Sequence, residues 1–194
     1  MQKSIVYFQQ PGEQNTAQVI QSAKERALEL GIKEIVVAST SGKTGIALAN
    51  ALKGTGIRTI AVTHHYGSSE KGKWKVEPGH AADLKELGAT IVSQTHSFSG
   101  IEKSISKTTG GISRIEIVAD TLRKLFGRGF KVAVEVAVMA ADSGAISMQN
   151  DIIALGGSAH GADVACVIKP AHSNDFFNLQ VKEIIAMPQE KNKS

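Results

Sequence analysis

The strongest chemical signal in the sequence is a run of hydroxyl residues, glycines and one lysine between a strongly apolar segment and a helical one. The run consists of Ser39, Thr40, Ser41, Gly42, Lys43, Thr44 and Gly45. Hydroxyls and free backbone N–H groups at a helix start form an anion site, which the positive end of the helix dipole strengthens. Lys43 would add a full positive charge. We therefore expect a phosphate site here, although the same residues can also build a tight turn before a capped helix.

The tripeptide Gly42-Lys43-Thr44 also matches the end of the P-loop found in nucleoside triphosphatases. That motif requires its first glycine at the position of Val37, which lies inside the apolar segment. In addition, no acidic partner for Mg²⁺ stands at the end of a neighbouring predicted strand. We therefore exclude an ATPase.

A second group of polar residues follows the next two predicted strands. Thr63 and His64 end one of them, and His96 and Ser97 follow the other. Because parallel strands end at one edge of a sheet, these residues should lie beside the Ser39–Gly45 turn. The histidines could bind a ligand, act as a general base or make ordinary loop hydrogen bonds. Their spacing does not favour a metal site.

Two more segments could reach the same ligand. Arg114 follows a glycine pair at a predicted helix start, where it could clamp a phosphate or pair with a neighbouring carboxylate. Asp142, Ser143 and Gly144 follow a run of small residues, where they could bind a hydroxylated ligand or end a helix. Both segments are candidates for the site.

Alternating apolar runs and helical stretches must position these residues. We expect strands over 4–8, 34–38, 58–63, 90–93, 152–155, 165–168 and 181–185. Helices are expected from Asn15 to Gly31 and over 44–52, 81–87, 112–126 and 131–139, the last only slightly favoured over a strand. Asn15 and Gln18 have the spacing of a capping box. This alternation predicts a three-layer α/β/α sandwich with a mostly parallel sheet and a mixed C-terminal part, including a hairpin around 156–163.

Composition limits the class of protein. The 194 residues are 42% hydrophobic and 21% charged, which favours one folded domain over 1–194 with an inserted loop at 65–79 and a disordered tail at 189–194. A net charge of +4 is too small for a dedicated nucleic-acid binder. One cysteine, no signal peptide and no membrane-spanning run predict a cytoplasmic protein without nucleic-acid or membrane partners.

Two segments carry a resemblance to a known family. Residues 35–44 and 57–63 resemble the C-terminal α/β domain of pyruvate kinase, in which a similar turn holds the phosphate of an allosteric sugar phosphate. Residues 110–146 and 167–188 extend the resemblance to stand-alone archaeal and bacterial proteins similar to that domain. The resemblance implies that Ser39–Thr44 bind phosphate and that FMN is a candidate ligand. It also implies a homo-oligomer, by analogy with the subunit contacts of pyruvate kinase.

Pyruvate kinase activity itself is not expected, because a catalytic TIM barrel needs about 250 residues. The leading hypothesis is a protein that binds a phosphorylated cofactor or nucleotide. FMN would place its phosphate on the turn and its ring near His64, His96 and the 142–144 segment. The alternative is a sugar-phosphate sensor that acts on a partner. A weaker alternative is a hydrolase or isomerase with a histidine base. No substrate follows from the sequence, so an enzymatic role, including a flavin-dependent one, stays open.

Overall fold

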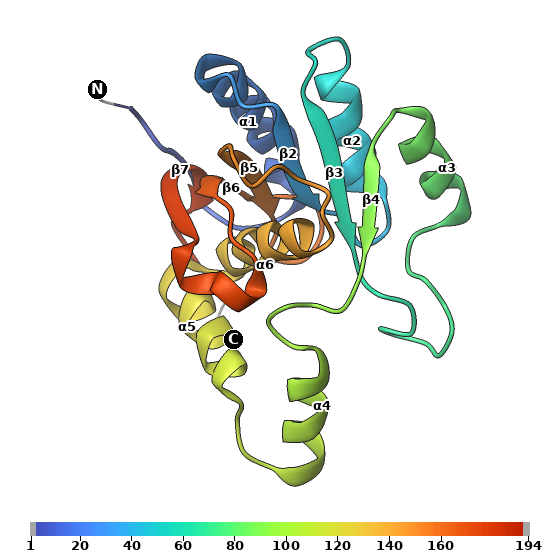
Figure 1. Cartoon of the computed structure of the whole chain (residues 1–194). Coiled ribbons are helices and arrows are strands. Elements are labelled where there is room, and N and C mark those ends of the chain that lie inside the picture. The colour runs from blue at the N-terminus through green and yellow to red at the C-terminus, as the bar shows by residue number, and fades with distance from the viewer. Residues whose placement is uncertain (1–2, 192–194) are drawn as a thin grey trace.

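A seven-stranded mixed sheet forms the centre of the molecule (Figure 1). The computed structural model describes residues 3–191. The strand order is β1-β7-β6-β5-β2-β3-β4, and β6 alone runs antiparallel to its neighbours among the described strands. The strands are β1 (Val6–Phe8), β2 (Glu34–Ala38), β3 (Arg58–Thr63), β4 (Thr90–Ser93), β5 (Ile152–Gly156), β6 (Val164–Lys169) and β7 (Gln180–Pro188).

Helices cover both faces of this sheet. One face packs against α1 (Thr16–Leu30), α2 (Lys43–Leu52) and α3 (Pro78–Glu86). The other packs against α6 (Arg128–Asp142), which is covered in turn by α5 (Arg114–Phe126). Helix α4 (Gly100–Thr109) projects away from the body in Figure 1, and none of its residues is buried. Two short 3₁₀ helices are η1 (Glu13–Asn15) and η2 (Ser173–Asn178).

Strand β2 shows how the alternation of side chains divides the core. Ile35 and Val37 contribute to the cluster beneath α1 and α2, whereas Val36 contributes to the cluster beneath α6. All three residues are fully buried. A continuous apolar strand is therefore required, because both of its faces are covered by helices. The predicted three-layer α/β/α architecture with a mixed C-terminal part is confirmed.

Some predicted local details differ from the structure. Asn15 stands at the N-cap position of α1 as predicted, but its side chain makes no capping hydrogen bond; its Nδ2 donates to the Gln10 carbonyl at 2.8 Å instead. Helix α3 begins at Pro78, earlier than predicted, since proline is well suited to the first helical turn. Helix α4 was not predicted; its two isoleucines, Ile101 and Ile105, are one turn apart and both are exposed.

Two segments predicted to be irregular are partly ordered. The loop between β3 and α3 packs back on the sheet, where Trp74 Nε1 donates to Thr63 Oγ1 at 3.1 Å. In the expected tail, the Gln189 backbone N–H donates to the Phe8 carbonyl at 2.8 Å and extends the contact with β1. Residues 192–194 lie outside the described part of the chain.

Candidate functional site

A polar cavity of about 340 Å³ lies at the carboxyl edge of the parallel strands. It sits at the topological switch point between β2 and β5, where open α/β sheets bind ligands. Its wall combines the β2–α2 turn, the end of β3, the segment after β4, one side of α6, one residue of α5 and the β5–β6 loop. The polar and charged lining residues are Ser39, Thr40, Ser41, Thr44, Thr63, His64, His96, Arg123, Arg128, Lys131, Glu135, Ser158 and His160.

The β2–α2 turn presents the start of a helix to this cavity. Ser39 is buried, and its Oγ accepts the backbone N–H of Gly45 at 2.9 Å. The Ile46 N–H donates to the Gly42 carbonyl, and Ser39 is the one described side chain that accepts an N–H from the first turn of α2. Among the described residues, the N–H groups of Lys43 and Thr44 therefore have no protein acceptor. Unsatisfied N–H groups at the positive end of a helix dipole favour an anion.

Gly42 and Lys43 serve this turn without lining the cavity. Gly42 has a φ of 100°, and a Cβ at this position would lie 2.6 Å from the Cβ of His80. The ring of His80 holds the turn from the α3 side, since its Nδ1 lies 2.8 Å from the Ser41 carbonyl and must carry a proton to donate there. The Lys43 side chain is exposed. The glycine is therefore needed for backbone geometry and helix contact.

A buried ion pair on α6 forms the floor of the cavity. Glu135 lies one helical turn after Lys131, whose Nζ donates to its carboxylate at 2.5 Å. The Phe98 N–H donates to the other carboxylate oxygen at 2.9 Å. Burial raises the pKa of Glu135, but hydrogen bonding with His96 and the charge of Lys131 outweigh it and bring the pKa to about 2. Burial lowers the pKa of Lys131, and the Glu135 carboxylate opposes that change.

Two histidines meet above this ion pair. The rings of His64 and His96 are 4.4 Å apart between centroids, and His96 Nδ1 lies 3.6 Å from the Glu135 carboxylate. Burial lowers the pKa of His64 to about 4, with smaller contributions from the charges of His96, Lys75 and His65. His64 is therefore a neutral imidazole at neutral pH.

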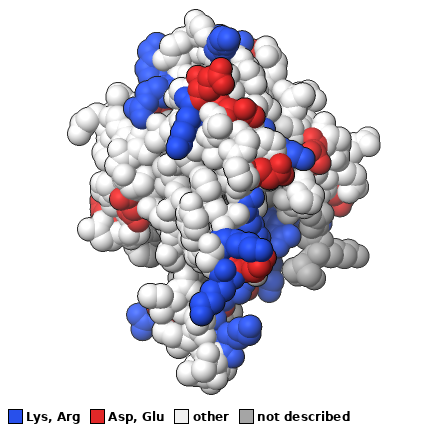
Figure 2. Space-filling model, turned by 90° about the vertical axis from the view of Figure 1, so that its right-hand side faces the viewer, with Lys and Arg blue, Asp and Glu red and all other residues white. Residues whose placement is uncertain are grey.

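The wall opposite the β2–α2 turn is basic. Arg128 begins α6 and donates to the Ser158 carbonyl at 3.3 Å. Arg123, on α5, pairs with the half-buried Asp120 at 2.5 Å. The surface outside is basic too. Figure 2 shows Lys and Arg gathered over the lower part of one face, where α4 and the loop before α3 lie in Figure 1. The electrostatic environment therefore favours an anionic ligand.

Close backbone contacts hold the basic wall and the β5–β6 loop in place. A Cβ at Gly156 would lie 2.1 Å from the Gly129 carbonyl, so the first turn of α6 rests directly on the end of β5. Asp163 is fully buried, and its Oδ2 accepts the N–H groups of Gly12 at 3.0 Å and Ser158 at 3.1 Å. Burial raises the pKa of this carboxyl. These contacts give the loop a defined shape beside the cavity.

The structure brings together seven of the residues expected from the sequence. Ser39, Thr40, Ser41, Thr44, Thr63, His64 and His96 line one cavity. Gly42, Lys43 and Ser97 are neighbours of that set along the chain and do not line it.

The other expected residues lie elsewhere. Arg114 is exposed at the first residue of α5. The segment Asp142–Gly144 ends α6 near the opposite edge of the sheet. There, the Ala145 carbonyl accepts Arg58 from the first residue of β3. Asp142 accepts the Ser173 N–H at 2.9 Å, and Gly144 ends the helix in a left-handed conformation. These four residues do not line the carboxyl-edge cavity, and the 142–144 segment lies away from it because α6 crosses the sheet toward the other edge.

Sequence reasoning missed the basic wall and the buried ion pair. Lys131 and Glu135 are four residues apart in an otherwise apolar helix, so both lie on the same helical face. Charged residues that share a face of a buried helix must pair or line a cavity. That spacing was the available signal. Arg123 and Arg128 had no such signal in the sequence, because the surface that each arginine reaches depends on how α5 packs on α6.

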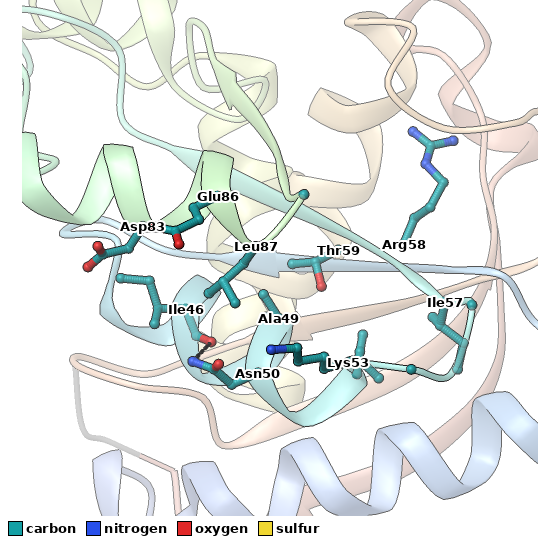
Figure 3. A pocket seen from close by; sticks show the side chains of 14 residues that line it. Ile46, Ala49, Asn50, Lys53, Ile57, Arg58, Thr59, Asp83, Glu86 and Leu87 are labelled. Atoms are coloured by element: carbon teal, nitrogen blue, oxygen red, sulfur yellow. Dashed lines mark hydrogen bonds between the residues drawn. The ribbon is translucent and has the colours of Figure 1, made fainter.

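A second hollow lies at the opposite, amino edge of the sheet (Figure 3). It measures about 680 Å³ and is bordered by the last turns of α2 and α3. Its charged residues have both signs: Lys53, Arg58, Asp83 and Glu86. Asn50 Nδ2 donates to the Ile46 carbonyl within its own helix at 3.1 Å. This hollow lacks the helix start and the basic wall of the carboxyl-edge cavity.

Two further features concern partners and metals. No helix in the part of the chain that the structure describes has the length and apolarity needed to cross a bilayer. Within residues 3–191, no three histidine, cysteine, aspartate or glutamate side chains gather in a way that could hold a metal ion.

The comparison with known proteins agrees with the fold. The family described as pyruvate kinase, alpha/beta domain, matches residues 17–168. Among solved structures, the chain is similar to Cryptosporidium parvum pyruvate kinase in complex with ADP, with 14% identity and a TM-score of 0.37. That match covers 88% of this chain and 23% of the other, so the chain spans less than a quarter of its length. The family match alone carries the assignment. The chain belongs to the pyruvate kinase alpha/beta domain family.

Proposed function

We propose that the protein binds a phosphorylated small molecule in the carboxyl-edge cavity, and that FMN is the first candidate. The observation that carries this proposal is the pair of unpartnered N–H groups at Lys43 and Thr44, beside hydroxyls that line the cavity. A phosphate dianion is the common biological group that accepts several such hydrogen bonds at once. Arg128 and Arg123 on the facing wall support the same charge.

The rest of the cavity suits the uncharged part of such a ligand. Its volume of about 340 Å³ is at the lower end of the range for small-molecule pockets, about 300–1,000 Å³. The Glu135 charge is balanced by Lys131, and His64 is neutral. We expect Thr40, Ser41 and Thr44 to hold the phosphate, and His64 and His96 to contact the ring system. Bound FMN would supply hydride- or electron-transfer chemistry.

A pair of neighbouring substitutions tests this assignment. Thr44 lines the cavity, whereas Lys43 is exposed beside it. Thr44→Glu would place a negative charge where the phosphate is expected, so we predict a loss of FMN affinity of about 100-fold or more. Lys43→Glu changes the net charge by more, yet we predict a loss of about 3-fold or less, because an exposed charge is screened by solvent. FMN titrations followed by flavin fluorescence would measure both.

Three other outcomes would change or overturn the proposal. Equal losses in the two variants would mean that only net charge matters and would contradict a phosphate on the turn. If FMN does not bind but a hexose phosphate raises the melting temperature, the cavity assignment would stand with sugar phosphate as the ligand. If neither FMN nor any of a set of phosphorylated sugars binds, the proposal is overturned.

A further inference from the structure

The cavity contains two imidazole rings whose protonation the phosphate assignment does not explain. His64 follows β3, His96 follows β4, and both line the cavity with their centroids 4.4 Å apart. Two rings this close repel each other when both are charged. A positive charge on one ring therefore disfavours a positive charge on the other.

The two rings have different neighbours. The Glu135 carboxylate lies 3.6 Å from His96 Nδ1 and can balance a positive charge on that ring. No carboxylate of residues 3–191 lies within ion-pair distance of His64. Burial and the charge of His96 lower the pKa of His64 to about 4. His64 is therefore a neutral imidazole with a single ring N–H at pH 6 in the free protein.

The groups around His64 are mostly cationic or able to become so. They come from every element that packs around the pair: His65 and Lys75 after β3, His96 after β4, Arg123 on α5, Arg128, Lys131 and Glu135 on α6, and His160 in the β5–β6 loop. Glu135 is the one anion in this set, and Lys131 already pairs with it. A proton that enters the free cavity therefore meets net repulsion.

A bound phosphate would reverse this balance. It brings up to two negative charges into the cavity that both rings line, and a negative charge near an imidazole favours the protonated form of that imidazole. Protonation of His64, which the free cavity disfavours, then becomes more favourable near neutral pH. The protonated ring would also gain a second N–H donor that can point toward the ligand.

We propose that the site takes up its phosphorylated ligand together with a proton from solvent, which the His64–His96 pair accepts. This inference rests on the proposed function, because it requires a phosphate in the cavity. It adds a property of the site: the ligand affinity should rise as the pH falls from about 7.5 to about 6. The protein would then release its ligand more readily in alkaline conditions.

Calorimetric titration with FMN tests the inference directly. Repeating the titration at about pH 6.5 in two buffers of different ionisation enthalpy gives the number of protons taken up per FMN. Ionisation of the FMN phosphate contributes equally in every variant and cancels in comparisons. Wild type should take up about 0.3–1 proton more than His64→Asn or the double variant His64→Asn/His96→Asn. His172→Asn, which changes a histidine outside the cavity, is the matched control and should resemble wild type.

A second measurement protects the test against misfolded variants. In wild-type protein with ¹⁵N-labelled histidine, saturation with FMN at about pH 6 should move one ring of the pair from the neutral to the imidazolium form. Equal proton uptake in wild type and the double variant, or neutral rings in the complex, would overturn the inference.

Inorganic phosphate, used as a second ligand, separates this inference from the proposed function. If FMN does not bind, the same titration is run with inorganic phosphate. Phosphate binding with histidine-dependent proton uptake keeps the inference and rejects FMN. Phosphate binding without that uptake rejects the inference and keeps a phosphate site. If neither FMN nor phosphate binds, both proposals are overturned.

Discussion

The two hollows at opposite ends of α2 show that size and chemical suitability do not coincide in this molecule. The amino-edge hollow measures about 680 Å³ and the carboxyl-edge cavity about 340 Å³. The larger one lies at the carboxyl end of α2, where backbone carbonyls carry partial negative charge. The smaller one lies at the amino end of α2 and has a basic wall. The polarity of one helix therefore decides which hollow suits a phosphate.

Buried charge is a second difference between the two regions. Glu135 and Lys131 form a nearly fully buried ion pair at the carboxyl-edge cavity. At the amino edge, Asp83 and Glu86 are exposed. Burying charge is costly, so the ion pair persists only because each partner compensates the other. The carboxyl-edge cavity is therefore the region where single substitutions should have large effects.

The largest expected effect comes from removing one partner of that ion pair. Glu135→Ala leaves the Lys131 ammonium buried without a counter-charge and leaves the Phe98 N–H without its acceptor. We predict a loss of about 3–5 kcal/mol in the free energy of unfolding, measured by urea denaturation. The matched change at the amino edge, Glu86→Ala, should alter it by no more than about 0.5 kcal/mol. Comparable losses for both variants would remove the contrast between the two regions.

The pH dependence of stability should be the next largest effect. The folded pKa of His64, about 4, lies below its ordinary value of 6.5. The unfolded chain therefore binds a proton first as the pH falls. The stability contribution is complete above about pH 6.5 and is lost progressively toward pH 4.

His64→Asn should remove this dependence. At about pH 5 the wild-type loss should be about 1–2 kcal/mol relative to pH 7, after allowing for the partial solvent contact of the ring. Thermal unfolding between pH 7 and pH 5 would compare wild type, His64→Asn and the control His172→Asn, which lies outside the cavity. A slope that is unchanged in His64→Asn would contradict a half-buried, neutral imidazole.

The smallest expected effect compares hydroxyl groups at the two ends of α2. Ser39→Ala removes the acceptor of the buried Gly45 N–H, and should cost about 1–2 kcal/mol and weaken ligand binding. Thr55→Ala removes a hydrogen bond with the Ile57 N–H at the other end, and should cost about 0.5–1 kcal/mol with no change in ligand affinity. Weaker binding in Thr55→Ala would argue that the affinity depends on global stability.

The sequence predicts the layers of the fold well, because continuous apolar strands and amphipathic helices leave few arrangements of the core. It also places the β2–α2 turn beside His64 and His96, since parallel strands end at one edge. The sequence does not predict where the 142–144 segment lies, because the length of α6 decides which edge of the sheet its end reaches. It fails for Arg123 and Arg128 for a related reason: the contact between α5 and α6 has no local signature.

The central claim is that a phosphate binds at the start of α2, and amide NMR tests it most directly. In a titration of ¹⁵N-labelled protein with FMN, the backbone amide resonances of Lys43 and Thr44 should shift with ligand concentration. The resonances of Gly54 and Gly88, which border the amino-edge hollow, should stay in place. Shifts confined to Gly54 and Gly88, or saturable FMN binding that leaves Lys43 and Thr44 unchanged, would contradict the claim.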